Sequence, residues 1–101
     1  MISKPQNDGV VIIPTYNEIE NIRAIIRAVT SLEKPLDVLI IDDGSPDGTA
    51  DAVKELMQTE LQGSLHLIER KGKLGLGTAY ICGFKWAIEH GYDYIFEMDA
   101  D

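Results

Sequence analysis

An apolar run that ends in two aspartates and a glycine-rich turn constrains the fold of this chain more than any other stretch. It occupies residues 38–51 and has the sequence VLIIDDGSPDGTAD. A short run bounded by turn residues is typical of a strand buried on both faces of a parallel sheet. The turn leads into a helix, for which Asp47 or Thr49 is the expected N-cap. Ligands of open α/β folds bind at the carboxyl ends of such strands. We therefore expect Asp42 and Asp43 to lie at a binding site, the alternative being that they only end the strand.

Apolar runs of this kind alternate with amphipathic segments along the rest of the chain. The predicted strands cover residues 9–14, 38–43, 64–69 and 92–98. The predicted helices cover residues 17–31, 49–63 and 78–90, with apolar side chains recurring on one helical face of the first two. Because parallel strands are joined by right-handed crossovers, this order predicts an α/β protein with a parallel sheet and helices on both faces.

Local signals refine two of the predicted helices. Asn17 and Glu20 have the spacing of a capping box at the start of the first helix. Gly91 stands where a C-cap glycine belongs after the third helix. Gly83 lies inside that helix, where glycine is less favourable than alanine by about 1 kcal/mol. We therefore expect a close backbone contact at Gly83 that compensates for this cost.

Charge and cysteine content exclude several classes of protein. The formal net charge of −8 over 101 residues opposes binding to the phosphate backbone of a nucleic acid. The single cysteine, Cys82, excludes an internal disulfide and a cysteine-rich zinc site, and it fits a reducing cytosol. No apolar run is long enough to span a bilayer, and the first residues lack the features of a signal peptide. We expect a cytoplasmic protein whose membrane contact, if there is one, is peripheral.

The last predicted strand delivers a pair of carboxylates at its end. Successive side chains of an extended chain point to opposite sides, so Asp99 and Asp101 project the same way. Two carboxylates at this spacing suit Mg²⁺ or Mn²⁺ bound together with the oxygens of a phosphate ligand. The predicted topology places this pair at the same sheet edge as Asp42 and Asp43.

A basic, glycine-rich segment, residues 70–77 (RKGKLGLG), precedes the third predicted helix. It is not a dinucleotide-binding fingerprint, because Tyr80 stands where the third Gly or Ala is needed and the segment follows the third strand. Arg70, Lys71 and Lys73 are instead predicted partners for diphosphate oxygens, the alternative being a solvated run of charges.

One cysteine and two histidines do not assemble a nucleophilic centre with a serine or an acid. Cys82 is predicted to pack inside an apolar helix. His66, inside the third predicted strand, is expected to have a structural or solvent-facing role.

Four segments of the chain resemble family-two glycosyltransferases, and more narrowly the dolichol-phosphate (polyprenol-monophosphate) mannosyltransferases. They are VVIIPTYNE, IIDDGSPDGTAD, KLGLGTAY and EMDAD, at residues 10–18, 40–51, 73–80 and 97–101. They occur in the order that the family has, and from the first to the last they span residues 10–101. The resemblance implies a GT-A-like (Rossmann-like) fold whose N-terminal part binds a nucleotide sugar.

The resemblance also implies roles for individual residues. The nucleotide contacts that it assigns are Pro14, Tyr16, Glu18, Ile41 and Asp43. It makes Asp99 and Asp101 the metal-binding and catalytic carboxylates, with the backbone of Ala100 close to the sugar nucleotide. Lys73 joins this set as the diphosphate contact predicted from the basic segment.

The implied reaction is the metal-dependent transfer of mannose, with inversion, from GDP-mannose to dolichyl or polyprenyl phosphate. The chain stops at Asp101, where the family continues. We therefore expect residues 1–101 to be the donor-binding N-terminal part of a truncated enzyme, inactive in transfer by itself. Three alternatives stay open: a UDP-sugar donor such as UDP-glucose, a fragment that binds nucleotide without turnover, and a non-enzymatic Mg²⁺-binding domain resembling a response-regulator receiver. In that last fold the acidic pair follows the first strand, where this chain has Pro14, Thr15 and Tyr16.

Overall fold

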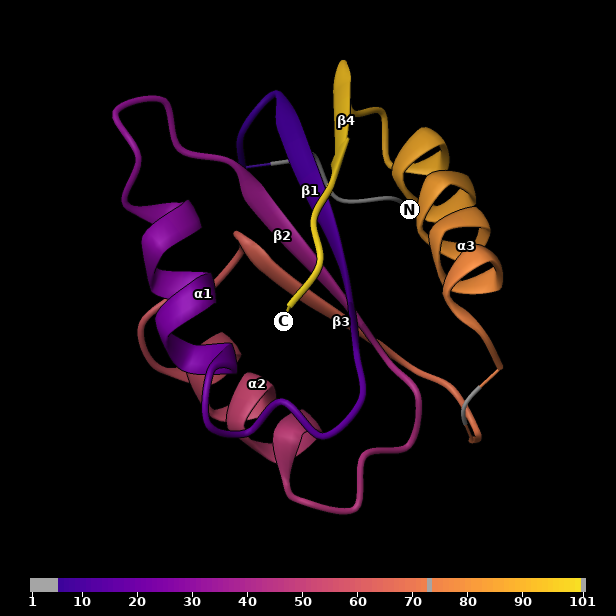
Figure 1. Cartoon of the computed structure of the whole chain (residues 1–101). Helices are drawn as coiled ribbons and strands as arrows, with labels where there is room; N and C mark the ends of the chain where they lie inside the picture. Colours follow the sequence, from indigo (N-terminus) through magenta and orange to yellow (C-terminus); the bar gives the residue numbers. More distant parts are fainter. Residues whose placement is uncertain (1–5, 73, 101) are drawn as a thin grey trace.

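Strands and helices alternate throughout residues 6–72 and 74–100, the part of the chain that this computed structural model describes (Figure 1). The elements are β1 (Gly9–Thr15), α1 (Ile22–Thr30), β2 (Asp37–Asp42), α2 (Thr49–Gln58), β3 (Leu65–Glu69), α3 (Leu76–Glu89) and β4 (Tyr94–Glu97). This order confirms the predicted alternation. None of the helices in the described residues has the length and hydropathy needed to cross a bilayer.

The strands form one parallel sheet with the order β3-β2-β1-β4. The two central strands, β1 and β2, pair over six positions, from Val10 with Asp37 to Thr15 with Asp42. Because all strands run in the same direction, the residues that follow β1, β2 and β4 meet at one edge of the sheet. The prediction of a parallel sheet is therefore confirmed.

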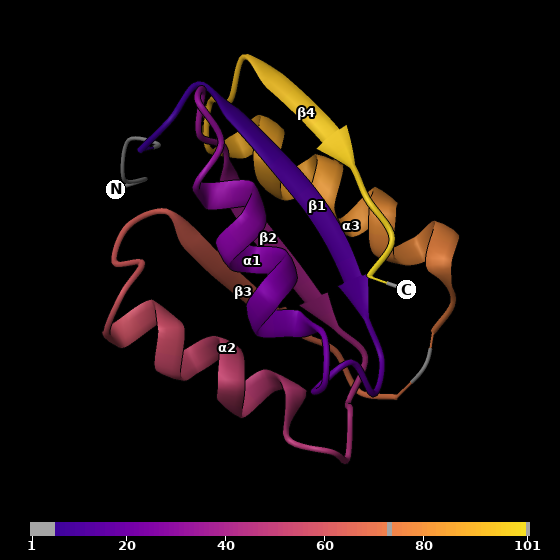
Figure 2. The same cartoon turned by 60° about the vertical axis from the view of Figure 1, so that its left-hand side comes forward.

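Helices cover both faces of the sheet, with α1 and α2 on one face and α3 on the other (Figure 2). The central strands bury side chains on both faces. In β1, Val11 and Ile13 belong to the core under α1 and α2, whereas Val10 and Ile12 belong to the core under α3. Burial on both faces explains why β1 and β2 are continuous apolar runs rather than alternating patterns.

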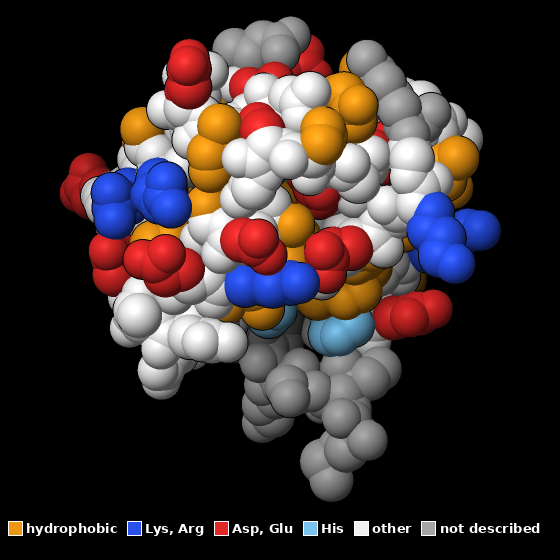
Figure 3. Space-filling view, turned by 90° about the horizontal axis from the view of Figure 1, so that it is seen from below, with side chains coloured by type: hydrophobic (Ala, Val, Ile, Leu, Met, Phe, Trp, Pro, Cys, Tyr) orange, Lys and Arg blue, Asp and Glu red, His pale blue; other side chains and the backbone are white. Residues whose placement is uncertain are grey.

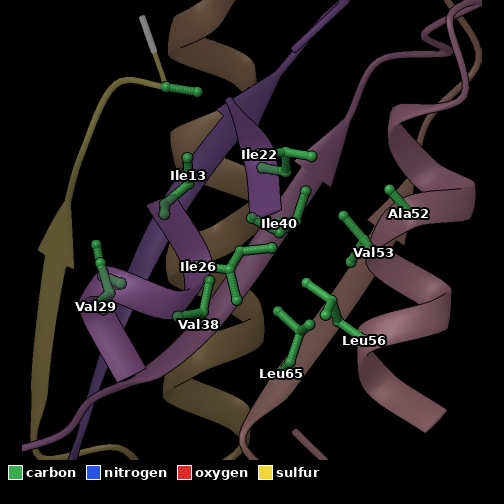
Figure 4. Packing of buried hydrophobic residues seen from close by; sticks show 12 residues of the cluster. Ile13, Ile22, Ile26, Val29, Val38, Ile40, Ala52, Val53, Leu56 and Leu65 are labelled. Carbon is green, nitrogen blue, oxygen red and sulfur yellow. The ribbon is translucent and has the colours of Figure 1, made fainter. Parts of the chain in front are cut away.

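The core between the sheet and helices α1 and α2 follows from the spacing of apolar residues. Ile22 and Ile26, one helical turn apart on α1, point toward Ile13 and Ile40 of the sheet, and Leu56 of α2 closes the same layer (Figure 4). Both isoleucines of α1 are fully buried. Burial of each such side chain contributes about 1.5–3 kcal/mol to folding. The predicted apolar faces of the first two helices are thus confirmed.

Helix α3 approaches the opposite face closely at Gly83. A Cβ atom at Gly83 would lie 2.6 Å from Cγ2 of Ile12, which is fully buried in β1. The expected close contact is present, and it is made with an isoleucine side chain. Cys82 packs partly buried against the same core, as predicted.

Four predicted helix boundaries were wrong, among them the end of the second helix, because α2 ends at Gln58 and not near Gly63. Helix α1 begins at Ile22 after Asn21, whereas Asn17 lies earlier in the loop with φ 57°, so Asn17 and Glu20 form no capping box. Gly48, with φ 93°, occupies the N-cap position of α2, rather than Asp47 or Thr49. Helix α3 begins at Leu76, two residues earlier than predicted, and β4 is shorter than the predicted strand. For the start of α1, the cause lies in contacts between two loops, which are described below.

A buried polar cluster closes the amino-terminal edge of the sheet. Asp37 is fully buried and accepts hydrogen bonds from the hydroxyl of Tyr92 at 2.6 Å and from Nδ2 of Asn7 at 2.8 Å. Nε2 of His66 lies 3.4 Å from the hydroxyl of Tyr92. The ring centroids of His66 and Trp86 lie 4.9 Å apart. The structural role predicted for His66 agrees with these contacts.

Candidate functional site

A pocket of about 220 Å³ opens at the carboxyl-terminal edge of the sheet. It is lined by the last residues of β1, by residues that follow β1, β2 and β4, and by the start of α3: Pro14, Thr15, Tyr16, Glu18, Asp43, Gly75, Leu76, Asp99 and Ala100. Six of these residues were named from the sequence, and they come from three segments that are distant in the chain. The topology therefore assembles most of the predicted contacts in one place.

Figure 3 views the molecule from below, toward the end at which β1 and β2 finish. Acidic and basic side chains lie beside one another on this face, and hydrophobic atoms are exposed between them. The net charge of −8 is therefore not gathered into a continuous acidic surface here. An anionic ligand that approaches this end meets cations as well as carboxylates.

Asp42 organises the floor beneath the pocket. Its carboxylate accepts hydrogen bonds from Oγ1 of Thr15 at 2.8 Å, from Oγ of Ser45 at 2.6 Å and from the backbone N–H of Ser45 at 3.0 Å. The side chain is almost completely buried. Its carboxylate joins the ends of β1 and β2, and Asp42 lines a neighbouring pocket with Ser45 and Glu69 rather than the pocket that Asp43 lines.

The loop after β1 is held by side chains of the loop after β2. The backbone N–H groups of residues 17, 18 and 19 donate to Oγ of Ser45, Oγ1 of Thr49 and Oδ2 of Asp47, at 2.9, 3.0 and 3.2 Å. The bond to Ser45 occupies the backbone N–H of Asn17, which the predicted capping box would have paired with the side chain of Glu20. The three bonds also fix the backbone on which the pocket residues Tyr16 and Glu18 are carried.

Asp43 forms a bidentate ion pair with Arg70 at the pocket wall. Nε of Arg70 donates to Oδ1 at 2.7 Å and Nη2 donates to Oδ2 at 2.9 Å. Only 8% of the Asp43 side chain and 11% of the Arg70 side chain are exposed. Hydrogen bonding to Asp43 raises the pKa of the Arg70 guanidinium above its usual value. The sequence placed Arg70 on diphosphate oxygens, whereas the structure places it on Asp43, a partner 27 residues away that no local pattern indicates.

Asp99 lies exposed at the end of β4, and Tyr80 of α3 holds its carboxylate. The Tyr80 hydroxyl donates to Oδ1 of Asp99 at 3.0 Å. Burial, together with this hydrogen bond, raises the pKa of Tyr80 to about 12, so the hydroxyl remains a donor at neutral pH. Sequence reasoning did not assign Tyr80 to the site, although it ends one of the four quoted segments.

One predicted contact does not line the pocket, and two others lie outside the part of the chain that the structure describes. Ile41 is fully buried in the core beneath α3, so its side chain does not reach the pocket. Lys73 and Asp101 lie outside the described residues.

The donor atoms at the pocket fit a hard cation. Within residues 6–72 and 74–100, no group of three or more His, Cys, Asp or Glu side chains comes together for a metal ion. Asp99 offers a carboxylate beside the pocket, and carboxylate oxygens are ligands that Mg²⁺ and Mn²⁺ prefer. Mg²⁺ in particular is commonly held by one or two carboxylates, with phosphate oxygens and water completing its coordination. The residues present therefore suit a metal that arrives with a phosphate ligand.

Comparison with known proteins decides the family. The family model described as glycosyl transferase family 2 matches residues 10–101. The chain belongs to this family. Family membership decides against the receiver-like alternative and agrees with the resemblance carried by the four quoted segments.

Two curated relatives illustrate what the chain is similar to. The chain is 43% identical over 98 residues to a polyprenol monophosphomannose synthase of Mycolicibacterium smegmatis, covering 97% of this chain and 37% of that protein. It is 47% identical over 90 residues to an undecaprenyl-phosphate mannosyltransferase of Micrococcus luteus, covering 89% of this chain and 36% of that protein. The chain thus spans little more than a third of the length of these relatives.

A solved structure supports the fold of this family member. The chain is similar to a mannosyltransferase from Pyrobaculum calidifontis in complex with GDP-Man and Mn²⁺, with a TM-score of 0.73 and 30% identity. The match covers 84% of this chain and 25% of that one. The GT-A-like fold expected from the sequence is confirmed.

Proposed function

We propose that this chain binds GDP-mannose with a divalent cation and supplies the donor side of mannosyl transfer to a polyprenyl phosphate. One observation carries the proposal: a single pocket gathers Pro14, Tyr16, Glu18, Asp43, Asp99 and Ala100 from three strand ends. The names of the two curated relatives support a mannosyl donor and a lipid phosphate acceptor. The ligands of the solved neighbour support GDP-mannose and Mn²⁺.

The two carboxylates of the pocket have different roles in this proposal. Asp43, which follows β2 and lines the pocket, is proposed to accept a hydrogen bond from an N–H group of the nucleobase. Asp99, at the end of β4, is the described residue that holds the cation, and Asp101 is proposed as its second carboxylate. The metal, Mg²⁺ or Mn²⁺, supplies Lewis-acid stabilisation of the charge that develops on the departing diphosphate.

The transfer itself is a displacement at the anomeric carbon of mannose. An oxygen of the acceptor phosphate forms the new bond to this carbon, and the bond to the diphosphate oxygen breaks with its electron pair leaving on GDP. Attack from the opposite face inverts the anomeric centre. A phosphate monoester is already ionised at neutral pH, so the acceptor needs no strong general base. Because polyprenyl phosphates reside in membranes, we propose peripheral contact with a membrane surface during the reaction.

Calorimetric titration of this chain with GDP and with UDP, each with Mn²⁺ or with excess chelator, tests the proposal. We expect GDP binding that depends on Mn²⁺ and is tighter than UDP binding. Asp99→Asn should weaken Mn²⁺-dependent binding by about 1–3 kcal/mol, the scale of a lost charged partner. Asp93→Asn is the matched control, because this exposed aspartate precedes β4 and does not line the pocket.

Each arm of the titration decides a separate part of the proposal. Equal GDP affinity with Mn²⁺ and with chelator would contradict the metal requirement. Tighter binding of UDP than of GDP would favour the UDP-sugar alternative. An equal loss of affinity in the Asp93 and Asp99 variants would show that general charge, rather than a metal ligand, was responsible.

A further inference from the structure

We infer that Arg70 is a positioning residue for nucleobase recognition, acting through Asp43 rather than on the diphosphate. The inference rests on the proposed function, because it requires a nucleotide in the pocket that Asp43 lines. Its starting point is the bidentate pair, in which two guanidinium nitrogens bind two oxygens of one carboxylate. Such a fork-to-fork arrangement fixes the orientation of the carboxylate as well as its position.

The pair leaves acceptor capacity for a ligand. An ionised carboxylate has about four lone-pair sites, two on each oxygen. Arg70 approaches both oxygens from the same side and uses the inward-facing site of each, so the site that remains on each oxygen of Asp43 faces outward, away from the other. The carboxylate that Arg70 orients therefore offers a nucleobase N–H group one acceptor of fixed direction.

The guanidinium is itself anchored, so it is a fixed reference for Asp43. Nη1 of Arg70 donates to Oγ1 of Thr78 at 3.0 Å, and Nη2 also donates to the carbonyl of Gly75 at 3.3 Å. The backbone N–H of Arg70 donates to the carbonyl of Asp42 at 2.8 Å. Arg70 thus ties the end of β2 to the first turn of α3, on the two sides of the nucleotide pocket.

This geometry predicts that Arg70 affects the base and not the phosphates. Lysine keeps the charge but is a single point donor and cannot reproduce the fork. Arg70→Lys should therefore weaken GDP–Mn²⁺ binding by about tenfold, the scale of a lost charged hydrogen bond. Arg70→Gln should weaken it at least as much. Binding of inorganic pyrophosphate with Mn²⁺ should change less than about twofold in both variants, because pyrophosphate has no base.

The experiment is calorimetry of this chain with GDP–Mn²⁺ and with pyrophosphate–Mn²⁺. Lys85→Gln, on the exposed side of α3, controls for the loss of one positive charge. Asp43→Asn and the double variant Asp43→Asn/Arg70→Gln complete a cycle, in which the double variant should bind GDP no worse than Asp43→Asn alone. Since a calorimetric Kd refers to the folded fraction, partial unfolding of a variant lowers the stoichiometry and leaves the ratio of the two Kd values interpretable.

Every outcome bears on the inference. The inference is supported if the Arg70 variants lose affinity for GDP but not for pyrophosphate, and if the double variant loses less GDP affinity than the sum of the two single losses. Equal losses for GDP and pyrophosphate assign Arg70 to the phosphates or to general folding and overturn it, as does unchanged GDP affinity in Arg70→Gln. Absence of GDP binding to the wild-type chain overturns the proposed function itself, and is distinguishable because it appears before any substitution is made.

Discussion

Replacing Gly83 by alanine tests how tightly α3 is packed on the sheet. The new Cβ would lie 2.6 Å from Cγ2, 2.9 Å from Cδ1 and 3.0 Å from Cγ1 of Ile12. Ordinary carbon–carbon contacts lie at about 3.5–4.0 Å, so the first of these is too short by roughly 1 Å. Ile12 is fully buried in a central strand that is paired on both sides, so it has little room to move.

Two opposing free energies set the size of the effect. Alanine is favoured over glycine inside a helix by about 1 kcal/mol. Overpacking of a well-packed core costs about 1–3 kcal/mol, and the rigidity of the site places Gly83→Ala in the upper part of that range. The variant should therefore be less stable by about 1–2 kcal/mol. For a domain of this size, each kcal/mol lowers Tm by about 4–8 °C.

Thermal and urea unfolding followed by circular dichroism measure this change. Gly77→Ala is the matched control in the same helix, because nothing lies within 4 Å of its Cβ position, and it should not destabilise the protein. In the double variant Ile12→Ala/Gly83→Ala, the smaller side chain at position 12 leaves space for the new methyl group. The loss of stability in the double variant should therefore be smaller than the sum of the losses in the two single variants. A Gly83→Ala protein as stable as the wild type would refute the packing argument.

Two further predictions concern side chains with altered pKa values. Tyr80→Phe removes the hydrogen-bond donor to Asp99. Calorimetry should show Mn²⁺-dependent GDP binding weakened by about 1 kcal/mol, with no change in Tm large enough to explain the loss. Unchanged binding would contradict a positioning role for Tyr80. Burial lowers the pKa of His66 below its usual value; the charge of Asp37 opposes this shift and that of His90 adds to it. As the pH falls, His66 is therefore protonated in the unfolded chain before it is protonated in the folded one. Stability should therefore decrease below about pH 6.5. His66→Gln should flatten the dependence of Tm on pH between about 7.5 and 5.5. If Tm depends on pH in the same way in the wild type and in the variant, His66 does not contribute to the loss of stability.

The sheet and its layers could be predicted because they depend on short-range patterns. The apolar runs of β1 and β2 and the spacing of Ile22 and Ile26 on α1 specify burial without knowledge of any distant partner. The placement of Asp43 and Asp99 at one edge followed from the parallel topology alone.

Two local features were not anticipated because they depend on partners far away in the sequence. Asn17 was expected to cap α1, but its backbone N–H is taken by Ser45, 28 residues away. Arg70 was expected to face a ligand, but Asp43, 27 residues away, offers a buried bidentate partner. Neither partner is marked by a local pattern, because both bonds exist only after β1, β2 and β3 are aligned.

The pairing of Thr15 with Asp42 makes the shape of the pocket depend on the register of the two central strands. Oγ1 of Thr15 donates to the Asp42 carboxylate, and the carbonyl of Thr15 accepts from the backbone N–H of Asp43. A slip of one residue between two strands turns every side chain of one strand to the opposite face. Such a slip would break both bonds and turn Asp43 out of line with Tyr16. A ligand that fits the pocket therefore binds only chains whose central strands have paired correctly, and adding it during refolding should enrich that pairing over its slipped competitors.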